Sequence, residues 1–205
     1  MFKKTIFLSC FLFIQLASSQ KAADWVEINK VNSEIQLDIR YATTNNFLGQ
    51  AVYEKPRCFV RYAVAVKLDS IQNELETIKL GLKIFDGYRP LSVQKKMWQI
   101  LPDSRYVANP ANGSRHNRGA AVDVSLVDSS GNELNMPTDF DDFSRRAHQD
   151  YYDLPAEVLQ NRWILKTLMT QYGFTSIRTE WWHYDLKGWQ QFPVTDQSFS
   201  EIATP

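Results

Sequence analysis

The clearest periodic pattern in the chain lies between residues 64 and 81. Apolar residues recur there at steps of four and three, at Val64, Leu68, Ile71, Leu75 and Ile78. This spacing places them on one face of an amphipathic helix, and Gly81 is the expected stop.

Two further helices are indicated by their end signals. Ser92 follows Pro90 and is a good N-cap, so a helix is expected to begin there and to bury Val93, Met97 and Ile100. The second runs from Pro155 to Tyr172, with a proline in its first turn and Gly173 beyond its end. Its buried side should hold Val158, Leu165, Leu168, Met169 and Tyr172.

Alternating and β-branched stretches predict strands. They are "AAVDVSLV" (120–127) and "FTSIRTEWWHYDL" (174–186), with one or two short strands and a loop in 25–47. "LKIFDGYRP" (82–90) predicts a short strand that runs into a turn at Asp86–Gly87. Residues 101–119 are rich in turn formers and should form a surface loop. Because strands and helices do not alternate regularly, we expect an α+β domain with a mainly antiparallel central sheet flanked by helices.

The first nineteen residues are expected to lie outside this domain. Lys3 and Lys4 precede an apolar run from Thr5 to Leu16, and small residues follow it. This is the layout of a secretory signal peptide (1–19), with cleavage near Ser19 and a mature domain of 20–205. An uncleaved anchor is the alternative. The mature protein is then exported, periplasmic or extracellular, with no stable membrane span.

Composition and charge narrow the function classes. A chain of 205 residues with 44% hydrophobic residues is a globular protein large enough for one core. Signal cleavage leaves 21 basic against 23 acidic residues, which gives no support to a nucleic-acid partner. It also leaves Cys58 as the only cysteine, so no internal disulfide is expected and Cys58 should be a small buried hydrophobe.

Histidine is scarce, and two of the three histidines have companions suited to a metal. His116 precedes an Arg118–Gly119 turn and a strand that carries Asp123, and the turn lets both side chains converge. His183 is the natural third ligand. Two histidines and an aspartate bind zinc and leave a fourth position for water, as in catalytic sites. His148 is expected to be a surface or helix-end residue.

The stretch "TEWWHYD" (179–185) has two interpretations. It is either an aromatic strand with a surface glutamate, or a bent segment that brings Glu180 to a metal-bound water beside His183. A fully extended segment would separate these two residues by about 10 Å, so catalysis requires a bend that Trp181 and Trp182 could fix by packing. Arg89 is in turn either a surface arginine or a cleft residue that stabilises a developing oxyanion.

Several blocks of the sequence resemble one enzyme family when taken together. "DGYRP", "SRHNRGAAVD" and "EWWH", with "IRYATTNNFLG" upstream and "FDDF" between, occur in the order found in the zinc D-alanyl-D-alanine dipeptidases of the VanX type. The resemblance extends from about Tyr41 to Tyr184. A single block would be weak evidence, but five blocks in order are specific.

The resemblance implies a role for each matching residue. Zinc, one ion per chain in a cleft, would be bound by His116, Asp123 and His183. Glu180 would be the general base and Arg89 the stabiliser of the transition state. Substrate-binding positions match Tyr41, Ser114 and Asp141, with Asp141 suited to meet the substrate's ammonium group. The implied partner is a small dipeptide, and the sequence makes no prediction of oligomeric state.

Three functions remain open from the sequence. The first is a zinc metallopeptidase that hydrolyses the D-Ala-D-Ala dipeptide with a metal-activated water. The second is a zinc carboxypeptidase or endopeptidase that cuts peptidoglycan stem peptides. The third is a non-catalytic zinc-binding module, which the presence of both Glu180 and Arg89 disfavours.

Overall fold

The computed structural model describes residues 24–203, and the predicted signal peptide lies outside them. The strands are β1 (Trp25–Glu27), β2 (Gln36–Leu37), β3 (Phe59–Arg61), β4 (Leu80–Asp86), β5 (Ala121–Asp128), β6 (Phe174–Ser176) and β7 (His183–Leu186). The helices are α2 (Ile28–Val31), α3 (Tyr62–Thr77), α4 (Leu91–Ile100), α5 (Ala156–Gln171) and α6 (Phe199–Ala203). Short 3-10 helices lie at Arg40–Ala42, His116–Arg118, Arg145–Ala147 and Trp189–Gln191.

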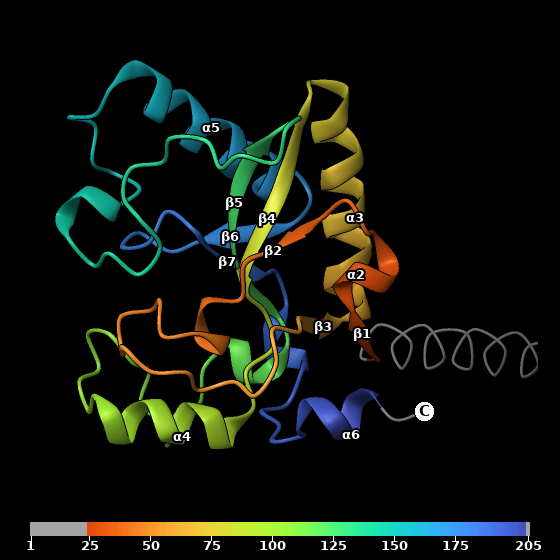
Figure 1. Ribbon diagram of the computed structural model, residues 1–205, viewed down its shortest axis with the longest axis vertical. Coiled ribbons are helices and arrows are strands. Elements are labelled where there is room, and N and C mark those ends of the chain that lie inside the picture. Colours follow the sequence, from red (N-terminus) through yellow and green to blue (C-terminus); the bar gives the residue numbers. More distant parts are fainter. Residues whose placement is uncertain (1–23, 204–205) are drawn as a thin grey trace, which may run out of the picture.

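A five-stranded sheet in the order β2-β4-β5-β7-β6 forms the centre of the described chain (Figure 1). Its β2–β4 pair is parallel and its other pairs are antiparallel, whereas β1 and β3 form a separate two-stranded antiparallel sheet. Helix α3 packs on β4, and α5 packs on β5 and β6. These observations confirm the predicted α+β class.

The predicted helices are present, with different ends in two of them. In α3 the four apolar residues from Val64 to Leu75 are fully buried. The prediction that Gly81 ends the helix was wrong. The helix ends at Thr77, and Lys79 takes the left-handed conformation (φ 61°). Gly81 lies inside β4. Ile78 therefore lies beyond the helix and is 53% exposed, not part of its buried face.

Helix α4 begins at Leu91 with Pro90 in the N-cap position, so the prediction that Ser92 caps it was wrong. The Ser92 amide instead donates to the Asp196 carboxylate at 2.5 Å. A side chain distant in sequence thus supplies the cap. Met97 is buried as expected, and α5 matches its predicted range within one residue at each end, with Tyr172 only partly buried.

The stretch 174–186 is not one strand, as predicted, but the two strands β6 and β7 of an antiparallel pair. Residues 177–182 connect them, so Glu180 lies in a bend that leads directly into β7. The bend is fixed from inside, because Trp181 and Trp182 are both essentially fully buried, as predicted. Cys58 is also buried, at 1% exposure.

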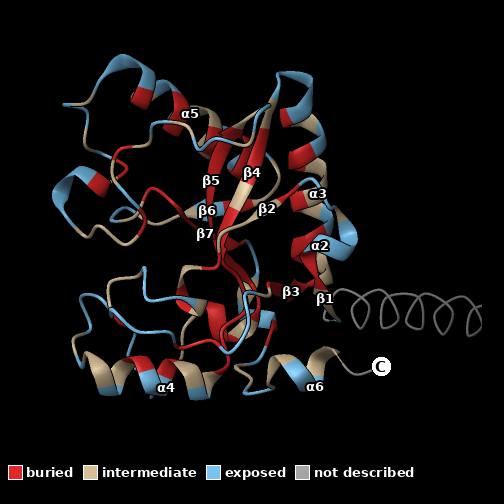
Figure 2. Cartoon of the chain, in the orientation of Figure 1, coloured by how far each residue is buried: buried red, intermediate tan, exposed pale blue. Residues whose placement is uncertain are grey.

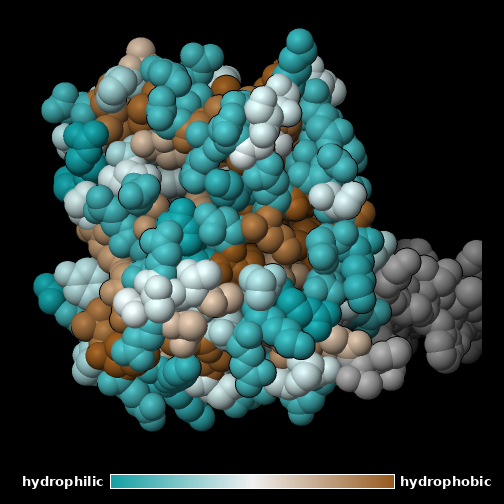
Figure 3. Space-filling view, in the orientation of Figure 1, coloured by the Kyte–Doolittle hydropathy of each residue, from teal (hydrophilic) through white to brown (hydrophobic). Residues whose placement is uncertain are grey.

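Burial is concentrated on the central strands and on the inner sides of the helices (Figure 2). On the face of the molecule shown in Figure 3, hydrophobic residues lie in several separate areas among mostly hydrophilic ones. None of the helices between residues 24 and 203 is long and apolar enough to cross a membrane.

Candidate metal centre

Three neighbouring strands place ionisable residues of the site side by side in one row across the sheet. Asp123 of β5 pairs directly with His183 of β7 on one side and with Asp86 of β4 on the other. Asp86 reaches that position because the β4–β5 register shifts between Ile84 and Asp86. Such bulges redirect a side chain next to an active site. The backbone ladder therefore aligns three ionisable groups across the sheet.

His116 joins this row from a tight turn. It begins the 3-10 helix His116–Arg118, which is followed by Gly119 with a left-handed φ of 67°. A Cβ at Gly119 would lie 2.2 Å from the Trp25 ring, so glycine is required there by conformation and by space. The turn brings His116 and Asp123 together, as the sequence predicted.

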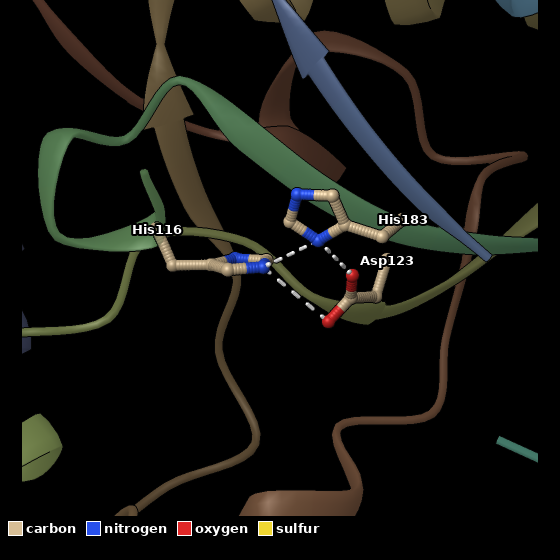
Figure 4. A group of neighbouring side chains, drawn as sticks. All are labelled: His116, Asp123 and His183. Atoms are coloured by element: carbon tan, nitrogen blue, oxygen red, sulfur yellow. Dashed lines mark hydrogen bonds and ion pairs between the residues drawn. The ribbon is translucent and has the colours of Figure 1, made fainter. Parts of the chain in front are cut away.

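The three predicted ligands converge on one point and are all buried (Figure 4). His116 Nε2 lies 3.2 Å from His183 Nδ1 and 3.5 Å from Asp123 Oδ2, and His183 Nδ1 lies 3.0 Å from Asp123 Oδ1. Ligand atoms bound tetrahedrally to zinc at 2.0–2.1 Å are separated by about 3.3–3.4 Å. The two ring nitrogens, and the Asp123 oxygen nearer to each of them, therefore lie close to the spacing that zinc requires.

The outer nitrogens of both histidines are held by acceptors. His116 Nδ1 donates to the Gly87 carbonyl at 2.8 Å, and His183 Nε2 donates to Asp185 Oδ1 at 2.9 Å. Because these nitrogens carry the protons, the neutral rings present lone pairs at His116 Nε2 and His183 Nδ1. The donor set fits zinc in chemistry as well as in spacing.

Charges around the ligands shift their pKa values. Burial alone would lower the pKa of His183, but Asp123 and Asp185 outweigh it and raise that pKa to about 10. Burial likewise opposes ionisation of Asp123, but His116 and His183 bring its pKa below the ordinary value. Proton and metal thus compete for the same nitrogen of His183.

Glu180 lies beside the ligands without being one of them. Its carboxylate oxygen is 3.9 Å from His183 Nδ1, which the bend before β7 makes possible. Burial raises the pKa of the Glu180 carboxyl above its ordinary value, although His183 counteracts this. A carboxylate with a raised pKa next to a zinc position is suited to accept a proton from water.

Arg89 is a buried residue of the same cleft and not a surface arginine. Its Nε and Nη2 donate to Asp86 Oδ2 at 3.1 and 2.6 Å, and its Nη1 donates to Gln94 Oε1 at 3.0 Å. A guanidinium has five N–H groups, so two remain to meet a ligand in the cleft. Burial lowers the pKa of Arg89, but Asp86 outweighs it and keeps the group charged.

The predicted substrate-binding residues also line this cleft, a cavity of about 430 Å³. Tyr41 donates from its hydroxyl to both Asp141 oxygens, at 2.9 and 3.1 Å. Burial raises the pKa of Asp141 well above its ordinary range, and Asp123 adds to the effect. Ser114 Oγ accepts from the His116 amide at 3.2 Å. His148 lies elsewhere, at the end of a 3-10 helix.

Several supporting residues were not predicted. Asp86 and Gln94 fix Arg89, and Asp185 fixes His183 while pairing with Arg115 at 3.3 Å. Asp185 could have been found, because residues two apart in a strand share a face and its neighbour in that pattern is His183. Asp86 and Gln94 depend on the bulge and on α4, which carry no local sequence signal.

These features define a class. Three residues that could bind zinc, a carboxylate beside them and a buried arginine in the same cleft are the components of a zinc metallopeptidase. The chain belongs to the D-ala-D-ala dipeptidase family, whose model matches residues 21–205. Membership and donor geometry together confirm the expectation of a zinc metallopeptidase.

Individual relatives agree with this assignment. The chain is 33% identical over 180 residues to the D-alanyl-D-alanine dipeptidase of Escherichia coli (strain K12), covering 88% of this chain and 93% of that one. It is 33% identical over 173 residues to the enzyme of the same name from Enterococcus faecalis, covering 74% and 86%. It also matches the solved structure of the D,D-dipeptidase VanXYg at 18% identity and a TM-score of 0.41, covering 79% of this chain and 66% of that one. The assignment rests on the family match and on the two dipeptidase sequences, not on this structural similarity.

Proposed function

We propose that this protein hydrolyses the dipeptide D-Ala-D-Ala to free D-alanine. The single observation that carries the proposal is the convergence of His116, Asp123, His183, Glu180 and Arg89 in one cleft. Relatives named D-alanyl-D-alanine dipeptidase support the choice of substrate.

The ligands and their neighbours divide the reaction between them. When bound to His116, Asp123 and His183, zinc supplies Lewis-acid chemistry and lowers the pKa of water to about 7. Glu180 takes the proton from the attacking water and passes it to the leaving amine. The two remaining N–H groups of Arg89 donate to the carbonyl oxygen as its negative charge grows.

Charged groups of both signs suit the cleft to a zwitterionic dipeptide. Asp141 lines the cleft with its carboxyl group held by Tyr41, and an ammonium group beside it would favour its ionised form, which supports a role in receiving the substrate's amino end. Ser114 and Arg115 line it from the loop before His116 and offer donors to a carboxylate. A volume of about 430 Å³ is at the small end for ligand pockets, as a dipeptide requires.

The decisive experiment combines metal analysis with hydrolysis assays on purified protein. We expect about one zinc per chain and release of D-alanine from D-Ala-D-Ala, with little cleavage of L-Ala-L-Ala. Cleavage of a D-Ala-D-Ala-ended pentapeptide in place of the dipeptide would favour the carboxypeptidase or endopeptidase alternative. Absence of any peptide hydrolysis by zinc-loaded protein would leave only a zinc-binding module.

We also propose that the protein is exported and acts in the periplasm or outside the cell, on cell-wall material. The basic and apolar pattern of residues 1–19 supports this. N-terminal sequencing of the protein recovered from a cell-envelope extract should give a start near Gln20. An intact Met1 in cytosolic protein would contradict export.

A further inference from the structure

Two loops meet across the cleft through a pair of aromatic rings. Tyr106 belongs to the loop between α4 and His116, and Phe143 belongs to the segment that carries Asp141. Both line the cleft, and their ring centroids are 5.1 Å apart in an edge-to-face arrangement of 65°. We call this contact the Tyr106–Phe143 bridge.

Phe143 is held by other rings. Its centroid lies 5.3 Å from that of Phe47 and 6.2 Å from that of Trp182. Trp182 is fully buried and immediately precedes the ligand His183. Phe143 is thus fixed relative to the metal position by packing.

Tyr106 is held through its sequence neighbours. Val107 is 1% exposed, and the Ala108 carbonyl accepts from Gln94 Nε2 at 2.7 Å. The same Gln94 accepts from Arg89, so the loop and the arginine share one support. Tyr106 itself is 38% exposed, with the Arg105 guanidinium over its ring at 5.2 Å. The ring therefore stands between cleft and solvent on an anchored loop.

The bridge lies close in the chain to the group that meets the substrate's amino end. Phe143 follows Asp141 by two residues, and both line the cleft. Resting on the proposed function, an ammonium at Asp141 marks the point where any N-terminal extension of the substrate must leave. We propose that the Tyr106–Phe143 bridge closes the cleft at this end and limits the substrate to two residues.

The test compares two substrates in matched variants. Tyr106→Ala and Phe143→Ala should each raise the ratio of kcat/KM for a D-Ala-D-Ala-ended pentapeptide to that for D-Ala-D-Ala by about tenfold or more. Tyr106→Phe keeps the ring and should leave the ratio at its wild-type value. Circular dichroism and zinc content show whether each variant is folded and loaded.

The possible outcomes distinguish failure of the bridge proposal from failure of the proposed function. Wild-type protein that cleaves neither substrate contradicts the proposed function. Wild-type protein that cleaves both equally well, or folded alanine variants with an unchanged ratio, overturns the bridge alone. Loss of both activities in folded, zinc-loaded Tyr106→Ala also overturns it, because removing a wall should admit more substrates.

Discussion

At the scale of single residues, the Glu180 carboxylate lies near the three metal ligands but is not one of them. Glu180→Gln keeps the shape of the side chain and removes its ability to take a proton. We expect kcat to fall by about 10²–10⁴-fold while zinc content stays near one per chain. Enzyme assays with metal analysis check this, and His116→Ala should in contrast lose both. Near-normal turnover in Glu180→Gln would rule out the general-base role.

Substitution of Arg89 offers a second way to distinguish loss of catalysis from loss of metal binding. Arg89→Ala removes the two free N–H groups and should slow kcat about a hundredfold with zinc retained. Arg89→Lys is the matched control, because it keeps the charge but not the fork that binds Asp86 and Gln94 together. If Arg89→Ala turns over at the wild-type rate, its oxyanion role is wrong.

Asp185 contacts a ligand through its outer nitrogen and not through the metal position, so its effect should appear in metal affinity. Asp185→Ala leaves His183 Nε2 without its acceptor at 2.9 Å and should weaken zinc binding by about 10–100-fold. Asp185→Asn retains an acceptor oxygen and should lose less. Competition with a chromogenic chelator measures both. Equal zinc affinity in wild type and Asp185→Ala would show that the contact does not tune the site.

The site residues predicted from sequence were those with a local signal, such as a turn or a bend, or with a place in one of the family blocks, as for Arg89 and Asp141. His116 and Asp123 are joined by one turn, and Glu180 and His183 by one bend. Asp86 acquires its place only through the bulge opposite Asp123, and Gln94 through the seating of α4. Such long-range partners leave no periodic trace in the chain.

At the scale of elements, the turn at Gly119 carries His116 to the sheet. Gly119→Ala forces a side chain into left-handed backbone and onto Trp25, and we expect a loss of about 2 kcal/mol or more in the free energy of unfolding. Gly49→Ala is the control, because its φ of 66° is similar but nothing lies within 4 Å of the added atom. Urea unfolding of both variants tests this. Equal losses would mean that the contact with Trp25 contributes nothing.

Element ends were less predictable than elements themselves. The apolar face of α3 was correct from Val64 to Leu75, because periodicity reports burial. Its end was not, because Lys79 and not the expected glycine adopts the left-handed conformation. The division of 174–186 into β6 and β7 was likewise missed, since the connection between them contains no glycine or proline that would mark a turn.

At the scale of the whole molecule, zinc ties together β5, β7 and the turn before β5. Metal that binds only the folded state stabilises it by about 4 kcal/mol at a thousandfold excess over Kd, or on the order of 10 °C in Tm for a protein of this size. Chelator should therefore lower the Tm of the wild type reversibly. His116→Ala should melt at the same temperature with or without added zinc, and a wild-type Tm insensitive to chelator would contradict a tightly held ion.

The direct pairing of Asp123 with His183 has a consequence for redesign. The distance between these two ligands is set by backbone hydrogen bonds between β5 and β7, whereas Tyr106 and Phe143 stand on loops. We therefore expect loop exchange to alter which peptides enter while the metal scaffold stays intact. In a redesign, the paired strands β5 and β7 would be kept unchanged, and the loops that carry Tyr106 and Phe143 would be replaced to change which substrates are accepted.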